Sequence, residues 1–204
     1  MVATAPATGR HAWLVRHGET EWARLGRHTG RTDIALTEKG REQANALGRR
    51  LAGHPFSLVL TSPLSRAAET ARIAGFGAAA VADDDLMEWD YGALEGRTTA
   101  EIEREFPNWT IWRGPWPNGE SIEQVGRRAD RIIHRIRGAV TTGTTDDVLV
   151  FAHGHLLRIL AARWIGLPPA SGGLLELDTA TLSILGWERE DPSVELWNEA
   201  CHLG

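Results

Sequence analysis

The stretch Ala12-Trp13-Leu14-Val15-Arg16-His17-Gly18-Glu19-Thr20 joins a short apolar run directly to a cluster of polar residues. Apolar runs of similar length recur at 57–60 and 148–151. Continuous apolarity, in place of alternating apolar and polar residues, is typical of parallel strands that helices cover on both faces. The pattern therefore predicts three core strands of a parallel sheet.

Helical patterns separate these predicted strands. Apolar residues recur at three- and four-residue intervals, and capping residues stand at the expected helix starts. The sequence predicts a first helix that is capped by Thr37 and has Ala44, Leu47 and Leu51 on its inner face, and a second helix over 64–73. A third helix is expected after the capping-box pair Ser121 and Gln124, with an apolar stripe from Val125 to Val140. A fourth is expected to follow Gly154 and to end at Gly166.

Alternating strands and helices indicate an α/β fold, here a three-layer α/β/α sandwich with a mostly parallel central sheet. Residues 83–118 are rich in Trp, Pro and Gly and are interpreted as a lid-like insertion. Residues 181–187 and 194–197 are expected to be final strands. We predict a disordered tail over 1–10 and a single domain over 11–204.

The composition narrows the possible partners. The net charge of −5 gives no overall basic field for nucleic acid or an anionic membrane, so positive charge that holds an anion must be local. Cys201 is the only cysteine, which excludes an internal disulfide. Without a signal-peptide pattern or an apolar run of membrane-spanning length, the chain is expected to be cytoplasmic. The sequence assigns no oligomeric state.

Polar side chains follow each predicted core strand. Arg16 and His17 follow the first, Ser62 and Arg66 follow the second, and His153-Gly154-His155 follows the third. Ligands of open α/β sheets bind beyond the carboxyl ends of the strands. We therefore expect two arginines and at least two histidines at one edge of the sheet.

This set of residues suits a doubly charged phosphate ester. Arginine donates two parallel N–H bonds to a pair of phosphate oxygens. Arg16, Arg66 and His153 are expected to supply the charge that stabilises the transferring group. The glycines after the two histidines, Gly18 and Gly154, are expected to keep the chain narrow and to leave backbone N–H groups free for the phosphate.

The reaction also needs a nucleophile and an acid. His17 is the candidate nucleophile, because imidazole can be neutral near pH 7. The acid is expected within 86–96, where Glu88 would lie beside the bound phosphate, and like charge with partial desolvation favours a protonated carboxyl. Three nearby carboxylates remain alternatives for this role: Glu19, Asp90 and Glu95.

Several other features have two interpretations. The His153-x-His155 pair matches a metal-ligand spacing, but fixed arginine charge disfavours a cation, so we predict no metal. Trp109, Trp112 and Trp116 either pack the insertion onto the core, which we prefer, or stack on a ligand. The arginine pairs at 49–50 and 127–128 are interpreted as solvated helix faces.

Taken together, Arg-His-Gly-Glu-Thr at 16–20, Ser62-Pro63 with Arg66, Glu88 with Gly92 and Glu95-Gly96, and Ala152-His153-Gly154 resemble the histidine phosphatase (phosphoglycerate mutase-like) superfamily. The resemblance runs from about Trp13 to Trp187. It implies that His17 is the phosphorylated nucleophile, that Glu88 is the proton donor, and that Arg16, Arg66 and His153 form the phosphate pocket. It also implies substrate contacts for Thr29 and Gly30.

Finer features favour the phosphatase branch of this superfamily. Glu88-Trp89-Asp90-Tyr91-Gly92 and His153-Gly154-His155 with Arg158 are similar to sedoheptulose-1,7-bisphosphatase and to small bacterial acid phosphatases. Ala23 and His155 stand where mutases commonly carry asparagine. His155 and Arg158 are expected either to contact a second part of the substrate or to orient His153.

The expected function is hydrolysis of a small phosphorylated metabolite, with sugar phosphates or bisphosphates ahead of phosphoglycerates and without a cofactor. A phosphoglycerate mutase and a catalytically silent regulator that binds phosphorylated ligands are the alternatives.

Overall fold

The computed structural model describes residues 11–138 and 147–204. The predicted tail over 1–10 and the predicted helical residue Val140 lie outside the described residues. None of the helices in the described ranges is long and apolar enough to span a membrane.

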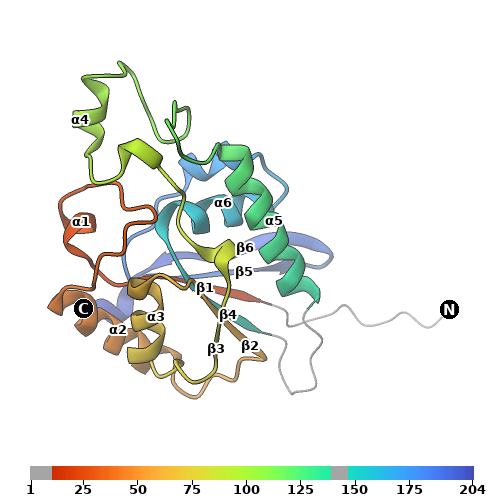
Figure 1. Ribbon diagram of the computed structural model, residues 1–204. Coiled ribbons are helices and arrows are strands. Elements are labelled where there is room, and N and C mark those ends of the chain that lie inside the picture. The colour runs from red at the N-terminus through yellow and green to blue at the C-terminus, as the bar shows by residue number, and fades with distance from the viewer. Residues whose placement is uncertain (1–10, 139–146) are drawn as a thin grey trace.

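A six-stranded sheet forms the centre of the molecule, and helices cover both of its faces (Figure 1). The predicted α/β/α sandwich is therefore confirmed. On one face lie α5 (Ile122–Gly138) and α6 (Gly154–Trp164); on the other lie α2 (Glu38–Leu51) and α3 (Ser65–Ile73).

The strands lie in the order β3 (Ala80–Ala82), β2 (Leu58–Thr61), β4 (Val148–Ala152), β1 (Ala12–Arg16), β5 (Leu182–Glu188) and β6 (Asp191–Glu199). The first four strands in this order are parallel to one another, whereas β5 is antiparallel to β1 and β6 is antiparallel to β5. The parallel strands β2, β4 and β1 therefore end beside one another, with Arg16 level with Ala152 and Thr61 level with Phe151.

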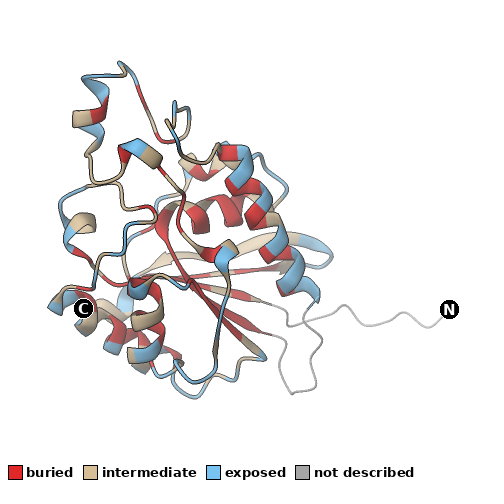
Figure 2. Ribbon diagram, in the orientation of Figure 1, coloured by how far each residue is buried: buried red, intermediate tan, exposed pale blue. Residues whose placement is uncertain are grey.

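Strand β4 explains why continuous apolarity indicates this architecture. All five of its residues are buried (Figure 2). Val148 and Val150 belong to the core under α5 and α6, whereas Leu149 and Phe151 belong to the core under α2 and α3. Successive side chains of a strand point to opposite faces, so a strand between two helical layers must be apolar at every position.

Residues 83–118 connect β3 to α5 and pack much of their aromatic surface inward. Trp109 is buried, and its indole Nε1 donates a hydrogen bond to the carbonyl oxygen of Pro115 (2.9 Å). Trp112 and Trp116 pack against the same core. The packing interpretation is confirmed for these tryptophans. The segment contains the short helices η1 (Asp84–Leu86), η2 (Gly92–Leu94) and α4 (Thr99–Glu103).

Three short helices complete the described elements. They are α1 (Glu21–Arg24) after β1, η3 (Pro169–Leu174) after α6 and η4 (Cys201–Leu203) at the C-terminus.

The structure differs from the sequence prediction at two places. Strand β3 was not expected, because its three residues carry no apolar pattern long enough to recognise. Arg128 is not on a solvated helix face: it is only 7% exposed, while Arg127, Arg49 and Arg50 are exposed as predicted. Its guanidinium lies between α5 and the segment that carries Glu88.

Candidate active site

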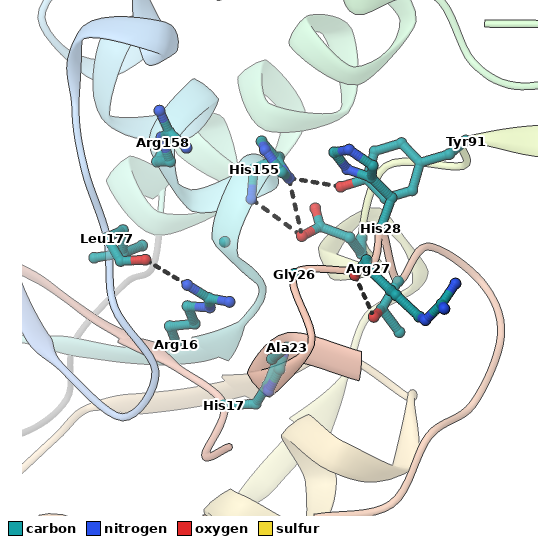
Figure 3. Close-up of a pocket in the computed structure, with 13 residues that line it drawn as sticks. Arg16, His17, Ala23, Gly26, Arg27, His28, Tyr91, His155, Arg158 and Leu177 are labelled. Atoms are coloured by element: carbon teal, nitrogen blue, oxygen red, sulfur yellow. Dashed lines mark hydrogen bonds and ion pairs between the residues drawn. The ribbon is translucent and has the colours of Figure 1, made fainter. Parts of the chain in front are cut away.

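The predicted site residues meet at the carboxyl edge of β1, β2 and β4. A cavity of about 190 Å³ opens there, and Arg16 and His17 line it together with Glu88 and His155 (Figure 3). Arg66 and His153 are fully buried directly behind these side chains. Residues from three strand ends and from the insertion are therefore brought to one place.

His17 is buried, and its ring orientation is defined by its own loop. Its Nδ1 lies 2.7 Å from the carbonyl oxygen of Gly18. A carbonyl oxygen only accepts, so Nδ1 carries the proton and Nε2 keeps a free lone pair in the neutral ring. Burial, followed by the charges of Arg66 and Arg16, holds the pKa of His17 well below its usual 6.5. The neutral, nucleophilic form is thus the stable one near neutral pH.

Arg66 connects the second strand end to the third. Its Nε donates to Nδ1 of His153 at 3.1 Å, and Nε2 of His153 is 2.8 Å from the hydroxyl of Ser62. Because Nδ1 accepts, the proton of the neutral His153 ring sits on Nε2 and is donated to Ser62. Burial and then the charge of Arg66 lower the pKa of His153 well below its usual value. In the free protein the positive charge of the pocket therefore comes from the arginines, and the expected charge on His153 is not found.

The remaining N–H groups of Arg66 hold a neighbouring loop. Nη1 donates to the carbonyl oxygen of Thr32, and Nη2 donates to those of Thr29 and Gly30. With the bond to His153, four of its five N–H donors are used in the free protein. Arg66 is thus a fixed charge that organises the loop as well as the pocket.

Arg16 is the donor that the free protein leaves unsatisfied. Nη1 donates to the carbonyl oxygen of Leu177. Its buried Nε has no hydrogen-bond partner among the described residues. Burial lowers the pKa of this guanidinium, although Glu88, Tyr91 and Asp178 oppose that shift. Arg16 as a whole is half-buried and lines the cavity, so its charged guanidinium is suited to receive an oxyanion there.

Glu88 enters the cavity from the insertion and sits at the N-terminus of α6. Its Oε1 accepts from the backbone N–H groups of Trp89 and Leu156, and its Oε2 accepts from that of His155 at 3.0 Å. A helix N-terminus offers unpaired N–H groups and a positive dipole end, which explains why a carboxylate is stable there. Of the acidic residues weighed for proton transfer, Glu88 is the one that lines the cavity.

The other three carboxylates have separate positions. Glu19 accepts a hydrogen bond from the hydroxyl of Thr37, and Asp90 accepts from the backbone of Gly92. Glu95 binds the backbone N–H groups of Arg31 and Thr32. Glu95 therefore fixes the loop whose carbonyl groups bind Arg66.

Two of the three predicted substrate-contact residues line the cavity, and the third packs behind its wall. Thr29 and His155 line the cavity, but Gly30 lies behind it. A Cβ atom on Gly30 would lie 2.2 Å from Oε1 of Glu95 and 2.6 Å from the carbonyl oxygen of Trp89. Glycine is thus required there by close packing.

The two predicted phosphate-loop glycines also serve packing. The N–H of Gly18 donates to the hydroxyl of Thr70, so it is not free, and a Cβ on Gly18 would lie 2.4 Å from the carbonyl oxygen of Gly40. A Cβ on Gly154 would lie 3.3 Å from the guanidinium of Arg16. Gly154 therefore makes room for that arginine.

The outer wall of the cavity is formed by Tyr91, His155 and Arg158. The Tyr91 hydroxyl is 2.6 Å from Nδ1 of His155. Burial raises the pKa of Tyr91 well above 10 and lowers that of His155, so both are neutral. The guanidinium of Arg158 donates to the carbonyl oxygens of Gly172 and Gly173 and lies 4.6 Å from the centre of the Trp112 ring.

Sequence reasoning assigned no role to four residues that line the cavity: Gly26, Arg27, Tyr91 and Leu177. Tyr91 follows Glu88 by three positions, and that spacing is the signal that could have revealed it. Gly26 and Arg27 shortly precede the recognised residues Thr29 and Gly30, and Leu177 comes from a loop without any motif.

The structure does not group His153 and His155 as metal ligands. Within the described ranges, no three His, Cys, Asp or Glu side chains are arranged so that they could hold a metal ion. His153 bonds Arg66 and Ser62, whereas His155 bonds Tyr91.

The chain has close relatives among characterised proteins. It is 41% identical over 177 residues to an acid phosphatase of Mycobacterium tuberculosis, covering 86% of this chain and 85% of that protein. It is 38% identical over 182 residues to sedoheptulose 1,7-bisphosphatase of Saccharomyces cerevisiae, covering 76% and 67%. A solved structure of an open reading frame product of Mycobacterium tuberculosis is 36% identical, with a TM-score of 0.86 over 94% of this chain and 98% of that one.

The sequence profile of the histidine phosphatase superfamily (branch 1) matches residues 12–200. This range contains all the strands and every residue described at the cavity. The chain therefore belongs to branch 1 of the histidine phosphatase superfamily.

Proposed function

We propose that the protein is a phosphatase that hydrolyses small phosphate monoesters through a phosphohistidine on His17. The observation that carries this proposal is that a neutral His17, whose Nε2 has no hydrogen bond among the described residues, lines the same cavity as Arg16, which keeps an unsatisfied N–H donor. A phosphate placed there satisfies the donor of Arg16 and presents phosphorus to His17.

The first chemical step forms a bond between Nε2 of His17 and phosphorus and breaks the bond from phosphorus to the ester oxygen. The proton for that departing oxygen comes from Glu88. Glu88 accepts three backbone N–H bonds as a carboxylate in the free protein, and it takes up the proton when the doubly charged ester binds beside it. The phosphorylated ring retains the proton on Nδ1, and the carbonyl oxygen of Gly18 stabilises the resulting positive ring. Arg16 and Arg66 balance the charge of the transferring group.

The second step returns the enzyme to its starting state. Glu88, now a carboxylate, takes a proton from a water molecule that attacks phosphorus, and the bond to Nε2 of His17 breaks. Inorganic phosphate and neutral His17 are the products, and Glu88 is protonated again. No cofactor or metal enters this scheme, in which the positive charge is supplied by arginine.

The favoured substrates are sugar phosphates and bisphosphates. A cavity of about 190 Å³ suits a small metabolite, and two of the chain's relatives are named an acid phosphatase and a sedoheptulose 1,7-bisphosphatase. Arg158 and Arg27 line the cavity and supply local positive charge for a second anionic group. We also propose a cytoplasmic location, because the single cysteine indicates a reducing compartment.

The test is phosphate release in excess chelator from sugar mono- and bisphosphates, phosphoglycerates and phosphopeptides, with His17→Ala as the matched variant. We expect rapid release from a sugar phosphate, an acid-labile phosphoryl adduct on His17, and neither in His17→Ala. Interconversion of phosphoglycerates without release would identify a mutase. A folded protein that binds these ligands but does not turn them over would identify a silent binder.

A further inference from the structure

The segment that carries Glu88 is held by an ion pair outside the cavity, between a buried arginine and a half-buried glutamate. Arg128 and Glu120 are the two members, and neither lines the cavity. Nε and Nη2 of Arg128 each lie 2.8 Å from one of the two carboxylate oxygens of Glu120. This bidentate geometry fixes both side chains relative to each other.

The same guanidinium binds the backbone on the N-terminal side of Glu88. Nη1 donates to the carbonyl oxygens of Asp85 (2.7 Å) and Met87 (2.9 Å), and Nη2 donates to that of Glu88 itself (3.4 Å). One side chain of α5 therefore satisfies three carbonyl groups within four residues.

Glu120 binds the backbone on the C-terminal side of Glu88. Its Oε2 accepts from the N–H of Asp90, while its own backbone N–H donates to the carbonyl oxygen of Asp90. Its carbonyl oxygen accepts from the indole Nε1 of Trp89 at 2.8 Å. Burial tends to raise the pKa of Glu120, but hydrogen bonds and charge from Arg128 outweigh it and keep the pKa below its usual value. The pair therefore stays ionised.

We propose that Arg128, together with Glu120, is a positioning residue that places the carboxyl group of Glu88 for proton transfer to the leaving group. This proposal rests on the acid role of Glu88 in the proposed function. The carboxylate of Glu88 accepts hydrogen bonds from backbone N–H groups of α6. Its position in the cavity therefore depends on how the backbone of residues 85–90 is placed relative to α6. Arg128 and Glu120 supply that constraint from α5.

A positioning role can be distinguished from a general effect on stability by measuring how far the loss in kcat/KM depends on the leaving group of the substrate. p-Nitrophenolate departs without protonation, whereas the alkoxide of a sugar phosphate needs the proton. The relevant quantity is kcat/KM, because it reports the first chemical step. A misplaced acid lowers kcat/KM for the sugar phosphate far more than for p-nitrophenyl phosphate, while a merely weakened fold lowers both equally.

The measured ratio is kcat/KM for the sugar phosphate divided by kcat/KM for p-nitrophenyl phosphate. We expect Arg128→Met to lower this ratio by about tenfold or more. Arg128→Lys keeps the charge without the bidentate fork, so the ratio should fall less. Arg127→Met is the matched control on the exposed face of the same helix, and it should leave the ratio unchanged. If Arg128→Met does not fold because half-buried Glu120 keeps only its longer contact with Arg31 (3.5 Å) as an ion pair among the described residues, the double variant Arg128→Met/Glu120→Leu removes both charges and tests the same ratio.

Glu88→Gln serves as the reference that separates the two proposals. If Glu88→Gln does not lower the ratio, the acid role of Glu88 in the proposed function fails. If Glu88→Gln lowers the ratio while the folded Arg128 variants keep the wild-type value, the positioning role of Arg128 is overturned and the acid role stands.

Discussion

At the scale of single residues, Arg16 carries a buried Nε that has no hydrogen-bond partner among the described residues. Arg66, which is fully buried, brings a second cation close to the same pocket. An unsatisfied buried donor costs about 1–3 kcal/mol of folding free energy. If the proposed oxyanion site is correct, a bound oxyanion offsets that cost.

Replacing Arg16 with methionine should therefore raise the melting temperature of the free protein and remove its stabilisation by inorganic phosphate. Thermal unfolding with and without phosphate measures both effects. Arg24→Met is the control, because the Arg24 side chain is 55% exposed and, within the described ranges, forms its ion pair with neighbouring Glu21 on α1. A loss of stability in free Arg16→Met, or an undiminished phosphate effect, would contradict this account.

Arg158 provides a second prediction at this scale. It lines the outer cavity and is held in place by Trp112 and by two carbonyl oxygens of η3. If it binds a second phosphate group, Arg158→Met should lower kcat/KM for a sugar bisphosphate by about tenfold or more, since a hydrogen bond to a charged group contributes about 1.5–3 kcal/mol. The corresponding monophosphate is the internal control. Equal losses on both substrates would assign Arg158 a structural role.

At the scale of elements, the loop 28–33 supports the pocket through backbone atoms. Glu95 holds its N–H groups and Arg66 holds its carbonyl groups, so both sides of the loop are fixed. The resulting close packing leaves no space for a side chain at Gly30.

Gly30→Ala should displace this loop and reduce kcat/KM by about 10²-fold, because a shift of about 1 Å in a supporting group can cost that much. Gly138→Ala is the matched control: no atom of residues 11–138 or 147–204 lies within 4 Å of a Cβ at Gly138, the last described residue of α5. Steady-state kinetics on both variants, with circular dichroism to verify folding, is the measurement. Wild-type kinetics in Gly30→Ala would show that the loop tolerates displacement.

The elements that were predicted correctly are those that a short stretch of sequence determines by itself, through its apolar pattern or its capping residues. Strand β4 is apolar throughout because both of its faces are covered, and the Ser121–Gln124 capping box forms as expected, with Ser121 N–H donating to Gln124 and Gln124 N–H donating to Ser121. Arg128 was misinterpreted because its position on α5 predicts exposure, whereas a segment about 40 residues earlier covers it. Leu177 and β3 depend in the same way on long-range packing that no short pattern encodes.

At the scale of the whole molecule, two buried and two half-buried histidines at one site make stability sensitive to acid. His17, His28, His153 and His155 all have lowered pKa values, and burial is the first cause in each case. The unfolded chain takes up protons near pH 6.5, whereas the folded protein resists doing so. The free energy of unfolding should therefore fall as the pH falls below 6.5.

His28 allows this effect to be isolated, because burial lowers its pKa to about 4. Its contribution is complete above pH 6.5 and is lost as the pH falls toward 4, with a slope of at most about 1.4 kcal/mol per pH unit. Between pH 7 and pH 5, the free energy of unfolding of the wild type should fall by about 2 kcal/mol more than that of His28→Gln. Denaturant unfolding at both pH values measures the difference, and parallel pH dependences would exclude His28 as a source.

The insertion 83–118 carries Glu88 together with Tyr91, a residue of the outer cavity wall, while the arginines and His17 come from strand ends and α3 (Figure 1). A substitution in this segment that reshapes the outer cavity wall therefore also changes the surroundings of Glu88. If Glu88 is the acid, we expect variants of this segment that accept a different ester to change their turnover rate at the same time.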